Sequence, residues 1–142
     1  MVERLPVFVY GTLRSGQRNH GLIADRVAER FPARVSGLGL FGDRIPFALE
    51  RPGQQVIGEL MVLDEAHYET AMADLDRLEK YHPDRPGDCL YTRVTWPVAY
   101  LAANGEWAEV PAWLYLTGEA ARGRYDENVP ILGGDWVAVQ VG

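Results

Sequence analysis

Short apolar runs alternate with polar turns along most of the chain, a pattern typical of a strand-rich domain. Residues 5–10 are nearly all apolar and rich in β-branched and aromatic side chains, which predicts a strand buried on both faces. Asn104-Gly105 predicts a tight hairpin, Arg51-Pro52-Gly53 predicts a turn, and Pro97 places its strand at an edge or a bulge. Further strands are predicted over 33–41, 47–50, 55–63, 90–101 and 110–116.

One segment, 65–81, is strongly helical, because its apolar residues recur every three or four positions. Asp64 supplies an N-cap, and Arg77 and Lys80 lie near the end, where basic residues suit the helix dipole. Asn19 predicts the cap of a shorter helix that runs to Val27. About six strands and one principal helix predict a mixed α+β domain with a curled or barrel-like sheet.

Glu79 is out of place in this helical pattern. It projects between Leu75 and Met72, within an apolar arc that also holds Tyr68, Ala71 and Leu78. It also lies in the last turn, where the dipole disfavours a carboxylate. One interpretation is a carboxylate in a pocket, its pKa raised by desolvation for general acid/base work. The other is a marginal glutamate that bends back to solvent, with or without an arginine as its partner, and periodicity alone slightly favours this interpretation.

The first predicted strand ends in the turn Tyr10-Gly11-Thr12-Leu13, which allows two interpretations as well. A strand that stops at a glycine leaves backbone N–H groups available for an anion or a carbonyl oxygen. A glycine after a strand is also the commonest sign of a plain turn, and spacing alone favours that account. The functional interpretation needs an acid/base residue across a cavity, which Glu79 could supply.

Composition narrows the class of protein. A length of 142 residues predicts one domain, 1–142, and the net charge of −6 with a pI of about 5.0 argues against nucleic acid or an anionic membrane as a partner. The chain has no secretion signal and no apolar stretch of membrane-spanning length, so we expect a cytoplasmic protein. Cys89 is the only cysteine, and the three histidines lack metal-ligand spacing, so no metal site is predicted. The G-x-G-x-x-G match at 37–42 is interpreted as chance, because Asp43-Arg44-Ile45-Pro46 looks extended rather than helical.

The motifs taken together resemble a known family. Residues 8–16, followed by Asn19-His20, are similar to the opening of the gamma-glutamylcyclotransferase-like family, closest in style to its gamma-glutamylamine cyclotransferase branch. The similarity continues in family order at 46–49, 56–60, 75–81, 91–93, Val98 and 112–115. Two departures are Lys80, where the family often has a glycine, and the long proline-rich segment 82–90.

The resemblance implies a small mixed barrel with flanking helices, with Glu79 as the acid/base and the 10–13 turn binding substrate through its backbone. Family members that are cyclotransferases convert a gamma-glutamyl amide into 5-oxoproline and a free amine. The substrate's own α-amine attacks its γ-carbonyl, so neither a protein nucleophile nor a cofactor is required. Tyr91 and Tyr115 are expected as pocket walls or hydroxyl donors.

The leading hypothesis is therefore a cofactor-free gamma-glutamyl cyclotransferase acting on a small gamma-glutamyl molecule. The alternative is a non-catalytic domain that keeps the cavity for a small carboxylate-bearing ligand, or that uses its surface for a protein partner. Neither the amine half of the substrate nor the oligomeric state follows from the sequence.

Overall fold

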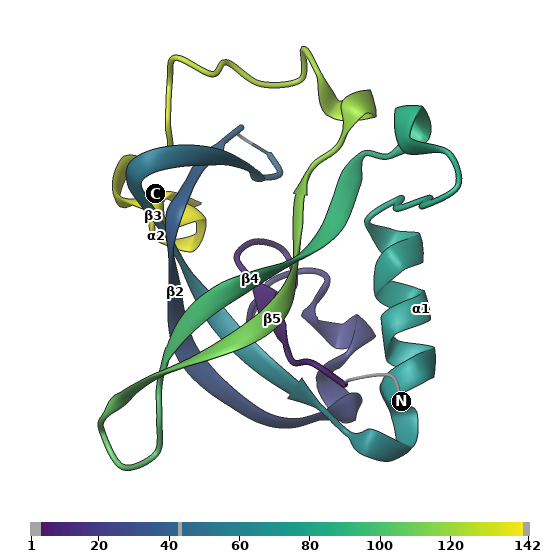
Figure 1. Ribbon diagram of the computed structural model, residues 1–142, viewed down its shortest axis with the longest axis vertical. Coiled ribbons are helices and arrows are strands. Elements are labelled where there is room, and N and C mark those ends of the chain that lie inside the picture. The colour runs from purple at the N-terminus through teal and green to yellow at the C-terminus, as the bar shows by residue number, and fades with distance from the viewer. Residues whose placement is uncertain (1–3, 43, 141–142) are drawn as a thin grey trace.

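A closed β-barrel organises the protein, seen in a computed structural model that describes residues 4–42 and 44–140 (Figure 1). The strand order is β1-β3-β2-β4-β5, and β1 closes the barrel by pairing in parallel with β5 at Val7 and Trp113. All other neighbouring strands are antiparallel, so the barrel is mixed, and the predicted α+β class is confirmed. The elements are β1 (Val7–Val9), β2 (Val27–Phe41), β3 (Phe47–Leu63), α1 (Tyr68–Leu78), β4 (Tyr91–Leu101), β5 (Trp107–Thr117) and α2 (Trp136–Gln140).

The barrel has five strands where the sequence predicts about six, because the predicted strands 47–50 and 55–63 are parts of β3. The turn predicted at Arg51-Pro52-Gly53 is wrong: the chain bulges there and continues in the same direction. Ser36 of β2 pairs with Gln55, whereas Leu38 pairs with Glu50, so the intervening residues of β3 have no one-to-one partners. Such a bulge bends a long strand and increases its twist, which helps it curl around a small barrel.

Two other boundaries differ from the prediction. The helix predicted from Asn19 to Val27 is replaced by two 3₁₀ turns, His20–Leu22 and Ala24–Arg26, and β2 already begins at Val27. The Asn19 amide makes no cap, because its Nδ2 donates to Thr12 Oγ1 at 2.9 Å. The sequence predicts that residues 43–46, before β3, are extended. Asp43 of this segment lies outside the described residues.

The strand signals in the second half agree with the structure. The hairpin at Asn104-Gly105 is confirmed: the Glu106 N–H donates to Asn104 Oδ1 at 3.0 Å, and Gly105 has a positive φ of 85°. Pro97 pairs opposite Pro111 without a register shift, beyond the short stretch where β4 also pairs with β2. It therefore lies on an edge portion of β4 and not in a bulge.

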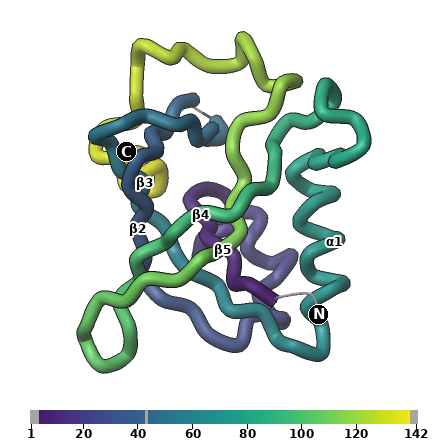
Figure 2. The backbone as a smooth tube through the Cα atoms, in the orientation of Figure 1, coloured from purple at the N-terminus to yellow at the C-terminus, as the bar shows by residue number. Residues whose placement is uncertain are grey.

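The helix α1 lies against one side of the barrel (Figures 1 and 2). Asp64 caps the preceding 3₁₀ turn by accepting from the Ala66 N–H at 2.9 Å. The helix ends at Leu78, three residues before the predicted end. Its buried face joins one hydrophobic cluster with Val7 and Val9 of β1, so the end of the helix and the end of the first strand are held on one core. The buried residues of this face are Tyr68, Ala71, Met72 and Leu75.

Candidate active site

A cavity of about 110 Å³ lies between the turn that follows β1 and the C-terminal end of α1. One water molecule needs roughly 10–15 Å³ of such space, so the cavity has room for a small organic group. It brings together every site residue predicted from the sequence, and several apolar residues complete its wall. The predicted residues in its lining are Tyr10, Gly11, Thr12, Leu13, Glu79, Tyr91 and Tyr115.

The turn after β1 presents bare backbone to this cavity. The Arg14 N–H donates to Gly11 O at 3.0 Å and closes the turn. A Cβ on Gly11 would lie 2.6 Å from Cγ of Pro46, another lining residue, so only glycine fits this approach. Among the turn and loop hydrogen bonds between described residues, none is donated by the N–H of Gly11, Thr12 or Leu13. These donors are available to a ligand, and consecutive free N–H groups suit an anion or an oxyanion.

Asn19 is a cavity residue that was absent from the predicted site, although it belongs to the motif that carried the family resemblance. Its backbone N–H donates to Thr12 O at 2.9 Å, in addition to the side-chain bond to Thr12 Oγ1. His20 adds a contact of its Nδ1 with Leu13 O at 2.9 Å. The loop that follows therefore holds the turn through the Thr12 hydroxyl and through the carbonyls of Thr12 and Leu13, and no described residue of the loop accepts from the N–H groups of the turn.

Glu79 is the C-cap residue of α1, and its backbone is fixed on both sides. Its N–H donates to Leu75 O at 2.9 Å, and its carbonyl accepts from the Tyr91 N–H at 3.2 Å, which joins the helix end to β4. Within the described part of the chain, the carboxylate has no hydrogen bond or ion pair. Burial raises the pKa of Glu79 to about 7, although the side chain keeps some exposure through the cavity. Both protonation states are therefore populated near neutral pH.

Lys80 is one of the two departures from the family pattern, and its backbone conformation explains why a glycine suits this position. It adopts a left-handed conformation with φ of 54°, the only non-glycine residue of the described chain with a positive φ. The Tyr81 N–H donates to Asp76 O at 2.9 Å and the Lys80 N–H to Arg77 O at 3.2 Å, which together form a Schellman motif. A glycine suits this position at no steric cost, whereas lysine is strained there. The Lys80 side chain is exposed and is not part of the cavity lining.

The hydroxyl groups of the three cavity tyrosines already donate hydrogen bonds to other groups of the protein. The Tyr10 O–H donates to the Tyr115 carbonyl, and the Tyr91 O–H to the Pro46 carbonyl at 2.7 Å. The Tyr115 O–H donates to Asp76 Oδ1 at 2.7 Å. Burial, more than any neighbouring charge, raises the pKa of each tyrosine, so all three remain neutral. Tyr91 and Tyr115 thus form walls whose hydroxyl oxygens can still accept a hydrogen bond.

Asp76 holds Tyr115 in place, and the local sequence around Asp76 does not indicate this contact. Its second oxygen, Oδ2, lies 3.4 Å from Nη1 of Arg93, whose guanidinium in turn lies 4.5 Å from the ring centroid of Trp113. One carboxylate thereby connects α1, β4 and β5 behind the cavity. Its partners come from distant strands, which only the folded barrel brings together.

The segment between α1 and β4 is held by Cys89, the only cysteine. Its buried Sγ accepts from the His82 N–H at 3.1 Å and contacts the His82 carbonyl oxygen at 3.2 Å, which fits a structural thiol. Among the residues that the structure describes, no group of three or more His, Cys, Asp or Glu side chains could hold a metal ion. No helix in the described ranges is long and apolar enough to cross a membrane.

The fold of the chain agrees with that of a known class of proteins. Residues 7–138 match the family described as "Gamma-glutamyl cyclotransferase, AIG2-like", and the chain belongs to this family. The resemblance found in the sequence motifs is thereby confirmed at the level of the family.

Individual relatives place the chain within that class. The Drosophila melanogaster protein named "Putative gamma-glutamylcyclotransferase CG2811" is 40% identical over an alignment of 90 residues, and the match covers 55% of this chain and 53% of that protein. The chain thus spans about half the length of this curated relative. The crystal structure of an AIG2-like protein from Mus musculus superposes with a TM-score of 0.58 and 28% identity, over 87% of this chain and 86% of that one. YkqA from Bacillus subtilis has a TM-score of 0.65 at 23% identity, over 96% of this chain and 40% of its own, which shows a common fold.

Proposed function

We propose that the protein is a gamma-glutamyl cyclotransferase, which releases 5-oxoproline and a free amine from a small gamma-glutamyl molecule. In this reaction the substrate's α-nitrogen forms a bond to its own γ-carbonyl carbon, and the bond from that carbon to the amine nitrogen breaks. The observation that carries the proposal is a carboxylate that shares a cavity with three backbone N–H groups, none of which has a hydrogen-bond partner among the described residues. Family membership supports the same reaction class.

Glu79 is the proposed general acid and base. It takes a proton from the attacking α-nitrogen and returns one to the departing amine, so the carboxylate ends the cycle in its starting state. A pKa of about 7 suits both tasks, because a group that titrates near the working pH both accepts and donates readily. A glutamate with its ordinary pKa of 4.5 would be a weaker base for the first step.

The turn after β1 is the proposed substrate cradle. The N–H groups of Gly11, Thr12 and Leu13 can bind the substrate carboxylate or the oxyanion that develops on the γ-carbonyl, and these donors are fixed before the substrate arrives. The cavity volume of about 110 Å³ suits a curled glutamyl chain, with the amine half extending outward. Holding the chain curled brings the two reacting atoms together, which accounts for a large part of the rate gain in intramolecular reactions.

The test is release of 5-oxoproline from a panel of gamma-glutamyl amines, gamma-glutamyl dipeptides and glutathione. We expect turnover of at least one member, and a loss of about 10²- to 10⁴-fold in kcat for Glu79→Gln, as for removal of a general acid/base group. The matched control is Glu69→Gln, which makes the same change at an exposed position of the same helix. If Glu79→Gln retains wild-type turnover, the assigned role of Glu79 is wrong.

A non-catalytic carboxylate-binding domain is the second candidate, because the same free N–H groups would hold a carboxylate without any chemistry. Absence of turnover across the panel, together with saturable binding of 5-oxoproline, would favour this candidate over the enzyme. If the protein binds neither a member of the panel nor 5-oxoproline, the result favours the alternative of a protein-interaction domain over both of these candidates.

A further inference from the structure

A second hollow, of about 370 Å³, is lined by residues of β2 and β3, by Arg14 of the loop after β1 and by Trp107 at the start of β5. We call it the arginine groove and define it by its charged and aromatic lining residues Arg14, Arg30, Arg34, Glu59 and Trp107. Three arginines face a single carboxylate here, in a chain whose net charge is −6. The proposed reaction makes no use of this groove.

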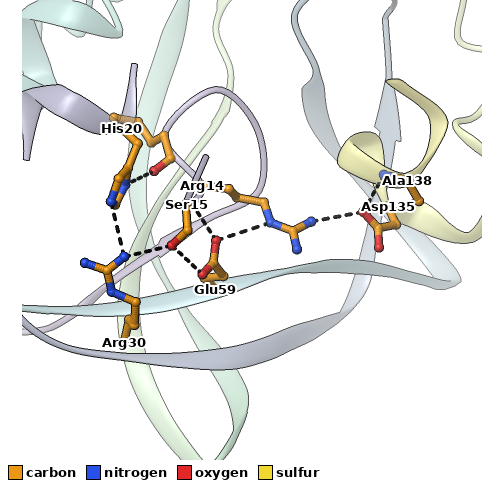
Figure 3. A network of polar contacts seen from close by, with 8 residues as sticks. Arg14, Ser15, His20, Arg30, Glu59, Asp135 and Ala138 are labelled. Atoms are coloured by element: carbon orange, nitrogen blue, oxygen red, sulfur yellow. Dashed lines mark hydrogen bonds and ion pairs between the residues drawn. The ribbon is translucent and has the colours of Figure 1, made fainter. Parts of the chain in front are cut away.

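Arg30 and Arg34 carry positive charge that no carboxylate of the described chain balances. Arg34 lies over the Trp107 ring, 4.1 Å from its centroid, and makes no hydrogen bond or ion pair to any described residue. Among the described residues, the Arg30 guanidinium contacts Ser15 Oγ at 3.0 Å and His20 Nε2 at 3.3 Å, with one terminal nitrogen used for both (Figure 3). Because a guanidinium has five N–H donors, most of those on both side chains have no partner among the described residues.

Arg14 and Glu59 form the inner end of the groove. Arg14 Nε lies 3.5 Å from Glu59 Oε1 and Nη1 lies 3.0 Å from Asp135 Oδ1, yet its buried Nε–H has no partner in hydrogen-bond geometry among the described residues (Figure 3). Glu59 already accepts from both the N–H and the hydroxyl of Ser15, at 2.8 and 2.9 Å. The one carboxylate of the groove is therefore engaged, and it leaves the two outer arginines uncompensated.

We propose that the arginine groove binds a small molecule with at least two phosphate or carboxylate groups. Planar guanidinium groups match the geometry of both kinds of oxyanion. Arg30 and Arg34 start from the same face of β2, about 13 Å apart along the strand, so two anionic groups satisfy them better than one. The fixed position of Arg34 on Trp107 lowers the entropy lost on binding.

The groove is also in contact with the loop that supports the cavity. Arg30 contacts Nε2 of His20, and Nδ1 of the same ring contacts the Leu13 carbonyl. An anion that draws Arg30 outward changes the surroundings of His20, and this gives the binding a local signal that is independent of any enzymatic activity.

Isothermal titration calorimetry of the full chain with tripolyphosphate and, separately, with citrate tests the proposal and distinguishes phosphate from carboxylate recognition. We expect saturable binding of at least one probe, weakened by added salt because the contacts are electrostatic. Arg34→Gln and Arg30→Gln should each raise the Kd by about 10- to 100-fold, as expected for loss of a hydrogen-bonded charge. The matched control Arg122→Gln changes an exposed arginine outside the groove and should leave the Kd unchanged.

NMR spectra recorded during the same titration supply the second measurement. The His20 ring and Leu13 amide signals should shift with the calorimetric Kd in the wild type and remain unmoved in Arg30→Gln. The proposal is overturned if neither probe binds saturably, or if Arg122→Gln weakens binding as much as the groove variants do. Because every readout is binding, the result is independent of whether the cyclotransferase activity is found.

Discussion

Asp76 and Glu79 lie three residues apart at the end of α1, and their surroundings are opposite. Asp76 accepts the Tyr115 hydroxyl and pairs with Arg93, so its charge helps to fasten the helix to two strands. Glu79 has no such partner within the described chain, and burial raises its pKa to about 7. Two carboxylates three residues apart thus differ: one is satisfied by the protein, and the other has no partner among the described residues. The difference arises from what the barrel places opposite each residue: Tyr115 and Arg93 opposite Asp76, and the cavity opposite Glu79.

The largest expected effect on stability comes from removing the charge of Glu79. Its native pKa of about 7 lies above the ordinary value of 4.5, so the native state binds this proton more tightly than the unfolded state does. The carboxylate's contribution therefore lowers the free energy of unfolding as pH rises from about 4.5 to 7, and the full penalty persists above pH 7. We expect Glu79→Gln to be more stable than wild type at pH 8, by about 3 kcal/mol at most.

Urea unfolding at pH 4 and pH 8 measures this difference. The stabilisation by Glu79→Gln should shrink towards zero at pH 4, where the wild-type carboxyl is protonated in both states. Glu69→Gln again serves as the control and should change little at either pH. Equal stability of Glu79→Gln and wild type at pH 8 would mean that Glu79 is solvated or paired in solution, and the contrast with Asp76 would be lost.

The cavity wall facing Glu79 can be tested at Gly11. In Gly11→Ala the new methyl group meets the Pro46 ring, which has little freedom to move. We expect a loss of about 1–3 kcal/mol in unfolding free energy, as for other overpacked sites, and a raised KM if the protein turns over the panel. Gly21→Ala is the control, because a Cβ there meets no atom within 4 Å. Wild-type stability and KM in Gly11→Ala would show that the turn is not held against Pro46.

Asp76→Asn should have the opposite sign to Glu79→Gln. The substitution keeps a hydrogen-bond acceptor for Tyr115 but removes the ion pair with Arg93, so we expect a loss of about 1–2 kcal/mol. Thermal and urea unfolding measure it, with Asp84→Asn at an exposed loop position as the control. If both Asp76→Asn and Glu79→Gln destabilise the protein, the two carboxylates play the same structural role.

The smallest expected effect concerns the residue after Glu79. Lys80→Gly relieves the left-handed backbone at φ of 54° and should stabilise the protein by about 1 kcal/mol, without changing the cavity. Lys80→Ala, which keeps the Cβ, should be close to wild type and separates backbone strain from loss of the charge. Equal stability of Lys80→Gly and Lys80→Ala would contradict the strain at this position.

Local patterns predicted the parts of the fold that depend on neighbouring residues. The Asn104-Gly105 hairpin and the Asp64 cap are examples, since a few adjacent side chains decide each one. The position of Glu79 beside the 10–13 turn also followed, because one residue broke the helical pattern and the family motifs suggested its counterpart. Its catalytic role stays a prediction.

What the sequence missed depends on distant partners. The residue types of Arg51-Pro52-Gly53 favour a turn, but β3 pairs with β2 both before and after this stretch, so it forms a bulge instead. Asn19 looked like a helix cap, yet its amide finds Thr12 across the loop. The partners of Asp76 and the arginine groove are likewise invisible to local patterns, because each assembles side chains from three or more segments.

The way the ends of the 82–90 segment are joined has a consequence for how this scaffold can vary. The Tyr91 N–H bonds to the Glu79 carbonyl and the Leu90 N–H to the Lys80 carbonyl, so the excursion between them begins and ends at one fixed junction (Figure 2). Doubling the length of a flexible loop costs only about 0.6 kcal/mol in closure entropy. Insertions, deletions and grafts in this segment can therefore reshape the approach to the cavity while Glu79 stays in register, which makes the segment a suitable place to alter what the cavity admits, by evolution or engineering.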